Sequence, residues 1–235
     1  MKFQIPKFFA SIGFKIHRLY YQQIFQKIYL NKHPPSWFDH RIDLYANWPH
    51  NLFWLERGIF ARKYMFEGCS VLDLFCGDGF FSRYFYSTIA SRIDAVDKDP
   101  SAIAHARRHH HHNLITFTVV NAVTEDFPQP HYDIIVWFEG IEHLHVAEYR
   151  EVITRIQRSL SPRGTLIGST PLIAKEQQGR GNWEHHHEFS SVEELTAFLS
   201  KDFGYVDVYT TIYPSLGGGN RHTAYFVLQS PFINS

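Results

Sequence analysis

The chain has 235 residues, 44% of them hydrophobic, and its 23 basic residues balance its 23 acidic ones. This length and composition predict one sizeable globular core, and the absence of a long uncharged apolar run excludes a membrane-spanning segment. The charge is uneven, because residues 1–38 hold six Lys and Arg and no acid, which leaves an acidic remainder. Such a remainder disfavours a nucleic-acid partner. The two cysteines, Cys69 and Cys76, favour a reduced, cytoplasmic protein.

Residues 1–33 show apolar side chains at near-helical spacing with basic and Gln residues between them. Two interpretations follow. The helix could lie on an anionic membrane, which would make the protein membrane-associated, or it could pack on the domain or a partner protein. The second is favoured, because apolar stripes at this spacing are usually buried. Residues 34–66 follow and are rich in aromatic side chains: Trp37, Phe38, Tyr45, Trp48, Phe53 and Trp54.

A buried strand, Val71–Leu74, leads into a loop in which Gly77 and Gly79 flank Asp78, and a helical stretch begins at Phe80. Glycine removes the Cβ that would hold a ligand away from the backbone. The strand-to-helix turn then directs free backbone N–H groups at the ligand. Asp73 and Asp78 argue against a phosphate and favour a ligand with an amino group and hydroxyls.

A second strand, 93–97, ends in Asp97 about twenty residues after the glycine loop. A carboxylate at this position can accept two ribose hydroxyl hydrogen bonds. We therefore predict that Asp97 binds a ribose, with Lys98 beside the base. A helix starting at Pro100 and a strand over 116–120 follow, and that strand ends at Asn121-Ala122.

The remaining elements alternate as a parallel sheet requires. The pattern predicts a strand over 132–138, a helix over 147–160, a turn at 161–164 and a strand over 164–171. Two further strands, 205–213 and 223–228, form an antiparallel hairpin.

The four motifs between residues 68 and 172 resemble, in order and spacing, those of the class I S-adenosylmethionine (SAM) methyltransferases. The resemblance implies an α/β, Rossmann-like seven-stranded sheet with an N-terminal helical extension. Residues 67–235 would be the methyltransferase domain, and residues 1–66 the extension, with its aromatic part as a lid over the substrate. An NAD-binding fold is disfavoured, because position 82 is Ser where a third glycine would stand.

The resemblance also implies a set of SAM contacts. Asn121 departs from the family, which usually has Asp there, although its side-chain carbonyl can still accept a hydrogen bond from the adenine amine. The expected cofactor-binding residues are Asp73, Phe75, Gly77, Asp78, Gly79, Asp97, Lys98, Asn121, Ala122 and Phe138.

Glu139, Glu142 and His143 follow the fourth predicted strand, at the sheet edge where open α/β folds bind ligands. With His187, or its neighbours His185 and His186, they could bind Mn²⁺ or Mg²⁺ and so activate a substrate hydroxyl. The motif resembles that of the ubiquinone-biosynthesis O-methyltransferases and of the small-RNA 2′-O-methyltransferases. The metal-free alternative leaves His143 as the general base or as a loop anchor.

The sequence thus predicts a SAM-dependent methyltransferase that acts on an oxygen of a small molecule or glycan, with or without a metal. An RNA 2′-O-methyltransferase is the alternative enzyme. A non-catalytic SAM-binding partner protein is the alternative of another class, which the presence of Asp73, Asp78 and Asp97 disfavours.

Overall fold

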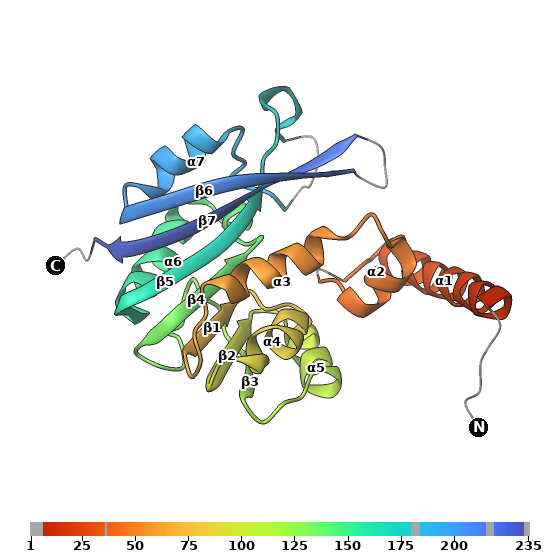
Figure 1. The fold of residues 1–235 in the computed structure, drawn as a ribbon. Coiled ribbons are helices and arrows are strands. Elements are labelled where there is room, and N and C mark those ends of the chain that lie inside the picture. Colours follow the sequence, from red (N-terminus) through yellow and green to blue (C-terminus); the bar gives the residue numbers. More distant parts are fainter. Residues whose placement is uncertain (1–6, 36, 180–183, 215–218, 233–235) are drawn as a thin grey trace.

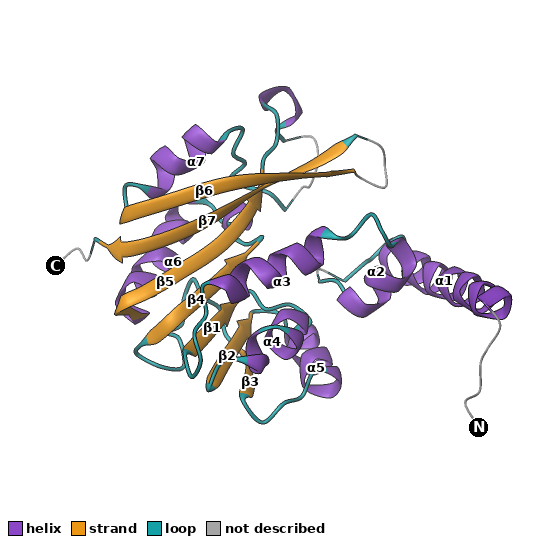
Figure 2. Cartoon of the chain, in the orientation of Figure 1, coloured by secondary structure: helices purple, strands orange, loops and turns teal. Residues whose placement is uncertain are grey.

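A computed structural model describes residues 7–35, 37–179, 184–214 and 219–232. Seven strands form one sheet in the order β3-β2-β1-β4-β5-β7-β6, with β7 antiparallel to both neighbours (Figures 1 and 2). The predicted seven-stranded Rossmann-like fold is therefore confirmed. The strands are β1 (Ser70–Leu74), β2 (Arg92–Asp97), β3 (Ile115–Val119), β4 (Tyr132–Phe138), β5 (Leu160–Pro171), β6 (Phe203–Pro214) and β7 (Asn220–Pro231).

Helices cover both faces of the sheet, and each face has its own apolar core. One core includes side chains of α3 (Phe53–Lys63), α4 (Phe80–Tyr84) and α5 (Pro100–His109). The other includes side chains of α6 (Val146–Ser159) and α7 (Val192–Leu199). In the described part of the chain, three single-turn 3₁₀ helices lie in the connections, over Tyr86–Thr88, Ile141–His143 and Lys175–Gln177.

The hydrophobic pattern of each strand follows its place in the sheet. Strands β1 and β4 are central and are covered on both faces, so nearly all their side chains are buried. The edge strand β3 alternates instead, with Ile115 and Phe117 buried and Thr116 exposed. Because β1, β2 and β4 are parallel, their carboxyl ends meet at one edge, where the predicted site residues follow them.

Strand β5 begins earlier than the sequence pattern predicts. Tyr132 pairs with Leu160, whereas Ile134 pairs with Thr165, so extra residues of β5 bulge out of the ladder. The predicted turn at 161–164 lies within this irregular start of β5, because Pro162 lacks the N–H that a regular ladder uses.

The N-terminal extension consists of α1 (Lys7–Tyr29), α2 (His40–Asn47) and α3, and α1 projects away from the sheet (Figure 1). The second half of α1 packs on α2, with the rings of Tyr21 and Tyr45 4.8 Å apart. The first half leaves Phe8, Ile12 and Ile16 exposed. Among the described helices, none is long and apolar enough to cross a membrane. Contact of residues 1–33 with a membrane surface or a partner protein stays a prediction.

The packing of α4 on the sheet predicts a measurable difference between two glycines with left-handed φ. A Cβ on Gly79 would come within 2.7 Å of Phe117, whereas one on Gly68 would meet nothing within 4 Å. Both Ala variants should lose about 1–2 kcal/mol through the backbone. Gly79→Ala should lose a further 1–3 kcal/mol or so through overpacking. Urea unfolding of both variants measures this, and equal losses would contradict the packing role.

Candidate active site

The loop from β1 to α4 has three residues with left-handed φ: Phe75, Gly77 and Gly79. The two glycines have different roles. A Cβ on Gly77 would point into open space, so its absence lets a ligand approach the backbone. A Cβ on Gly79 would collide with Phe117, so its absence allows α4 to pack on β3. Gly79 therefore has a packing role, and its predicted cofactor contact stays a prediction.

Asp78 faces the N-terminal extension. It is completely buried and does not line either cavity described below. Its carboxylate accepts hydrogen bonds from the backbone N–H of His40 and of Phe80, and the Nδ1 of His40 lies 2.9 Å from Oδ1. Burial raises the pKa of Asp78, but the contacts with His40 lower it below its ordinary value. The Asp78 side chain thus anchors α2 to the loop, and its predicted cofactor contact stays a prediction.

Asp97 fixes the other side of the loop. Its Oδ2 accepts a hydrogen bond from Gly77 N at 3.0 Å, and its Oδ1 accepts one from Asp99 N at 2.9 Å. Asp97 and Lys98 line both cavities, as expected for residues that bind a ribose and its base. Burial raises the pKa of Asp97.

A small cavity of about 190 Å³ lies beyond Asp97, between the ends of β2, β3 and β4. Phe75, Asn121 and Ala122, three of the expected cofactor contacts, line it. The side-chain carbonyl of Asn121 also accepts a hydrogen bond from Val123 N at 3.1 Å. The cavity also has an apolar wall that was not predicted from the sequence. Its residues suit a flat ring and lie at strand ends or in the segments that follow them: Val96, Val120, Val123 and Leu144.

A larger cavity of about 1460 Å³ separates the N-terminal extension from the carboxyl ends of the strands. Asp73, Gly77 and Phe138 line it on the sheet side. The aromatic segment predicted as a lid lines the opposite wall through Trp37, Phe38, Phe53 and Trp54. The closing motion of this segment stays a prediction.

Glu139 lies just after β4 in the left-handed region, with φ 47°. One oxygen lies 3.0 Å from Arg57 and accepts a hydrogen bond from Ser169, and the other contacts Arg221. Burial raises the pKa of Glu139, but Arg57 and Arg221 lower it below its ordinary value. Both oxygens are thus engaged by cations, so the structure argues against Glu139 as a metal ligand. The sequence analysis missed both arginines.

Glu142, His143 and His185 come together instead, with one ligand atom from each within 4.8 Å of the others. His187, the predicted fourth metal ligand, lies elsewhere, with its ring 4.6 Å from Phe189 and 4.7 Å from Phe198. His185, which the sequence analysis named as an alternative, takes its place.

The environments of Glu142 and His143 favour their neutral forms. Burial and the charge of Glu139 raise the pKa of Glu142 well above its ordinary value, and Thr170 donates a hydrogen bond to its carboxyl group. Burial and His185 lower the pKa of His143. The Nδ1 of His143 lies 3.2 Å from the carbonyl oxygen of Glu184. A carbonyl only accepts, so Nδ1 carries the proton and Nε2 keeps a basic lone pair.

Comparisons with known proteins agree with this geometry. Residues 71–164 match the family model described as a methyltransferase domain. The N-methyltransferase NodS from Bradyrhizobium japonicum WM9, solved with S-adenosylhomocysteine, aligns with a TM-score of 0.63 and 18% identity, over 88% of this chain and 98% of that one. The PH0226 protein from Pyrococcus horikoshii OT3 aligns with a TM-score of 0.62 and 20% identity, over 78% and 92%. No curated protein matches the chain.

One further structure shares the fold: the [4+2]-cyclase SpnF, with a TM-score of 0.58 and 13% identity, over 74% of this chain and 81% of that one. At such identities these structures show the fold alone. Together, the match over residues 71–164, the fold and the glycine loop show that the chain holds a SAM-dependent methyltransferase domain.

Asp73 predicts how SAM affinity depends on pH. It is buried at the cavity, accepts a hydrogen bond from Ser82, and has a pKa of about 7, raised mainly by burial and further by Asp78 and Asp97. Asp73 is neutral below this pH and becomes an anion above it, which should attract the cationic methionine end of SAM. Calorimetry should therefore show roughly tenfold tighter SAM binding at pH 8 than at pH 6.

The Asp73→Asn variant is the control for this prediction. It keeps an oxygen acceptor for Ser82 but cannot ionise, so it should lose most of the pH dependence. Asp97 titrates in both proteins, and the difference between the two curves therefore isolates Asp73. Identical curves for both proteins would contradict the assignment.

Proposed function

We propose that the protein methylates a hydroxyl oxygen of a small molecule or glycan, with His143 as the general base. The observation that carries this proposal is the position of His143. Its ring lines both the small cavity, where we expect the adenosine, and the large cavity, where the acceptor would enter. A hydroxyl must lose its proton as it attacks the methyl group, and an imidazole with a basic Nε2 can accept that proton.

The walls of the large cavity fit this class of acceptor. Trp37, Phe38, Phe53 and Trp54 supply flat apolar surfaces on which a phenol or sugar ring can stack. The Arg57, Glu139 and Arg221 cluster carries one net positive charge, so an acceptor with a phosphate or carboxylate would also be favoured here. Catalysis would then consist largely of holding the hydroxyl in line with the methyl group.

A metal-assisted reaction is the second candidate, favoured by the proximity of Glu142, His143 and His185. One carboxylate and two imidazoles suit Mn²⁺ better than Mg²⁺, which prefers oxygen ligands. The protein residues would hold the ion, and the ion would lower the pKa of the acceptor hydroxyl. Binding requires Glu142 to lose its proton, so this site would take up metal more readily at higher pH.

Release of S-adenosylhomocysteine from SAM, measured across catechols, phenols, glycosides, amines and a short oligoribonucleotide, tests the proposed activity. We expect turnover with a hydroxyl acceptor. His143→Ala should lower kcat by about 10²–10⁴-fold, because the proton acceptor is lost. The affinity for S-adenosylhomocysteine should change little. His131→Ala, which removes an exposed histidine, is the matched control.

The other outcomes distinguish the alternatives. An unchanged kcat in His143→Ala would overturn the role of the base. Activity that requires Mn²⁺ and is lost in Glu142→Gln would identify the metal-assisted reaction. Turnover of the oligoribonucleotide alone would identify an RNA methyltransferase. Cofactor binding without turnover of any acceptor would favour a non-catalytic SAM-binding partner protein.

A further inference from the structure

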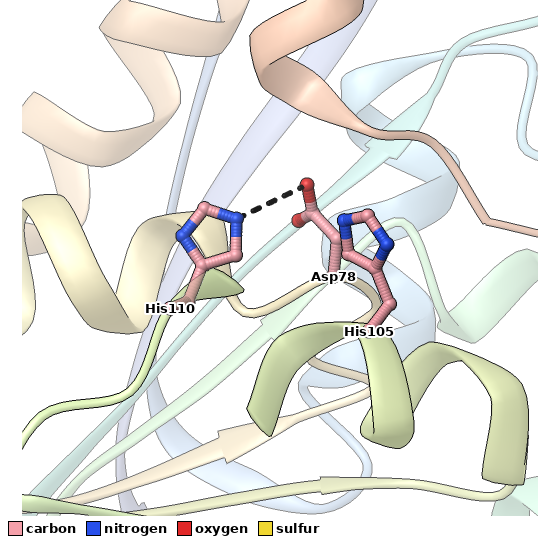
Figure 3. Close-up of side chains that lie close together, drawn as sticks. All are labelled: Asp78, His105 and His110. Atoms are coloured by element: carbon pink, nitrogen blue, oxygen red, sulfur yellow. Dashed lines mark ion pairs between the residues drawn. The ribbon is translucent and has the colours of Figure 1, made fainter. Parts of the chain in front are cut away.

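Three imidazoles surround the buried carboxylate of Asp78, on the part of the cofactor loop that faces α2 and α5. His40 comes from the start of α2, His105 from α5, and His110 from the residue just after α5. Figure 3 shows the rings of His105 and His110 on either side of Asp78. Asp78, His105 and His110 do not line either cavity, so this cluster is distinct from the candidate active site.

His110 is the unusual member of this cluster. It is completely buried, and neither of its ring nitrogens forms a hydrogen bond within the described part of the chain. Its Nε2 lies 4.0 Å from Asp78 Oδ2, which is too far for a direct hydrogen bond. Buried polar groups are normally paired, so an unpaired imidazole beside a carboxylate indicates a missing group between them. A neutral imidazole offers a ring nitrogen lone pair that can bind a metal ion.

The carboxylate of Asp78 has capacity for one more partner. Its Oδ1 contacts His40 Nδ1 and Phe80 N, whereas among the described residues its Oδ2 accepts a hydrogen bond only from His40 N. An oxygen of a carboxylate can accept two, so Oδ2 retains a lone pair on the side of His110. His40 holds the carboxylate in place, as outer partners commonly do around metal ligands.

The charges around the cluster favour a cation. A second carboxylate, that of Asp39, lies 3.0 Å from His105 Nε2 and pairs with Arg41. Two carboxylates, those of Asp39 and Asp78, therefore face the one guanidinium of Arg41. The aromatic rings of Trp37, Phe80 and Tyr84 lie against His105, His40 and His110.

We infer that Asp78, His105 and His110 form a binding site for a divalent transition-metal ion, with Zn²⁺ the ion that the donor set suits best. One ligand atom from each residue lies within 4.8 Å of the others. Two imidazoles and a carboxylate are common ligands of tetrahedral Zn²⁺, whereas Mg²⁺ and Ca²⁺ prefer oxygen. The bound ion would join α5 to the cofactor loop and, through His40, fix the N-terminal extension over the active site.

Co²⁺ is the probe that tests this site, because four-coordinate Co²⁺ with imidazole ligands absorbs visible light. We expect one equivalent of Co²⁺ to bind with this spectrum, to be displaced by Zn²⁺, and to raise the Tm of the whole chain. His110→Ala and His105→Gln should each weaken Co²⁺ binding at least tenfold. His105 is only partly buried, so His105→Gln keeps the test valid if His110→Ala fails to fold.

Two control variants separate this site from the other histidines. His111→Ala changes an exposed neighbour of His110, and Glu142→Gln changes the cluster in the active site. Both should bind Co²⁺ at this site as the original protein does. The inference is overturned if His105→Gln, folded and able to bind S-adenosylhomocysteine, retains full Co²⁺ affinity. It is also overturned if only His111→Ala or only Glu142→Gln loses the absorbing ion.

Discussion

The ion cluster of Glu139 with the buried Arg57 and the partly exposed Arg221 connects three walls of the active site. Glu139 follows the central strand β4, Arg57 comes from α3 of the N-terminal extension, and Arg221 comes from β7. Arg57 is itself buried and lies over the rings of Trp54 and Phe138. Breaking such a buried pair by removing one partner typically costs about 3–5 kcal/mol, so the position of the extension depends on it.

This cluster also affects the protonation of the neighbouring residue Glu142. Because Glu139 is ionised, its charge raises the pKa of Glu142, which remains a neutral carboxyl group next to His143. The two carboxyl groups of the Glu-x-x-Glu-His motif therefore differ in role: one is a structural anion and the other a protonated neighbour of the candidate base. Positive φ at both Phe75 and Glu139 places strained backbone at the ends of β1 and β4, as is common at functional sites.

The fold and the cofactor loop could be predicted from sequence because their signals are local. Gly77, Asp97 and Asn121 lie at strand ends, and parallel strands bring those ends to one edge of the sheet. The partner of Asp78 could not be predicted, because its position in the loop does not reveal which way its side chain points. Its partner His40 is 38 residues away in a segment without regular sequence signals.

The metal and ion-pair residues could not be predicted for the same reason, because their contacts join residues that are far apart in the sequence. Arg57 and Arg221 each lie 82 residues from Glu139 in the sequence, and neither lies in a recognisable motif. The choice between His185 and His187 depends on the path of one loop, in which the backbone N–H groups of His186 and His187 bond to the carbonyl of Glu142. This turn directs His185 toward His143 and leaves His187 against Phe198.

A crystal structure with S-adenosylhomocysteine would show directly how the cofactor lies on the glycine loop. We expect the ribose hydroxyls on Asp97, the adenine in the small cavity beside Asn121 and Ala122, and the amino-acid end over Gly77 near Asp73. The sulfur should face the large cavity beside His143. A ligand bound away from Gly77 and Asp97, or a protein that does not bind it at all, would contradict the account.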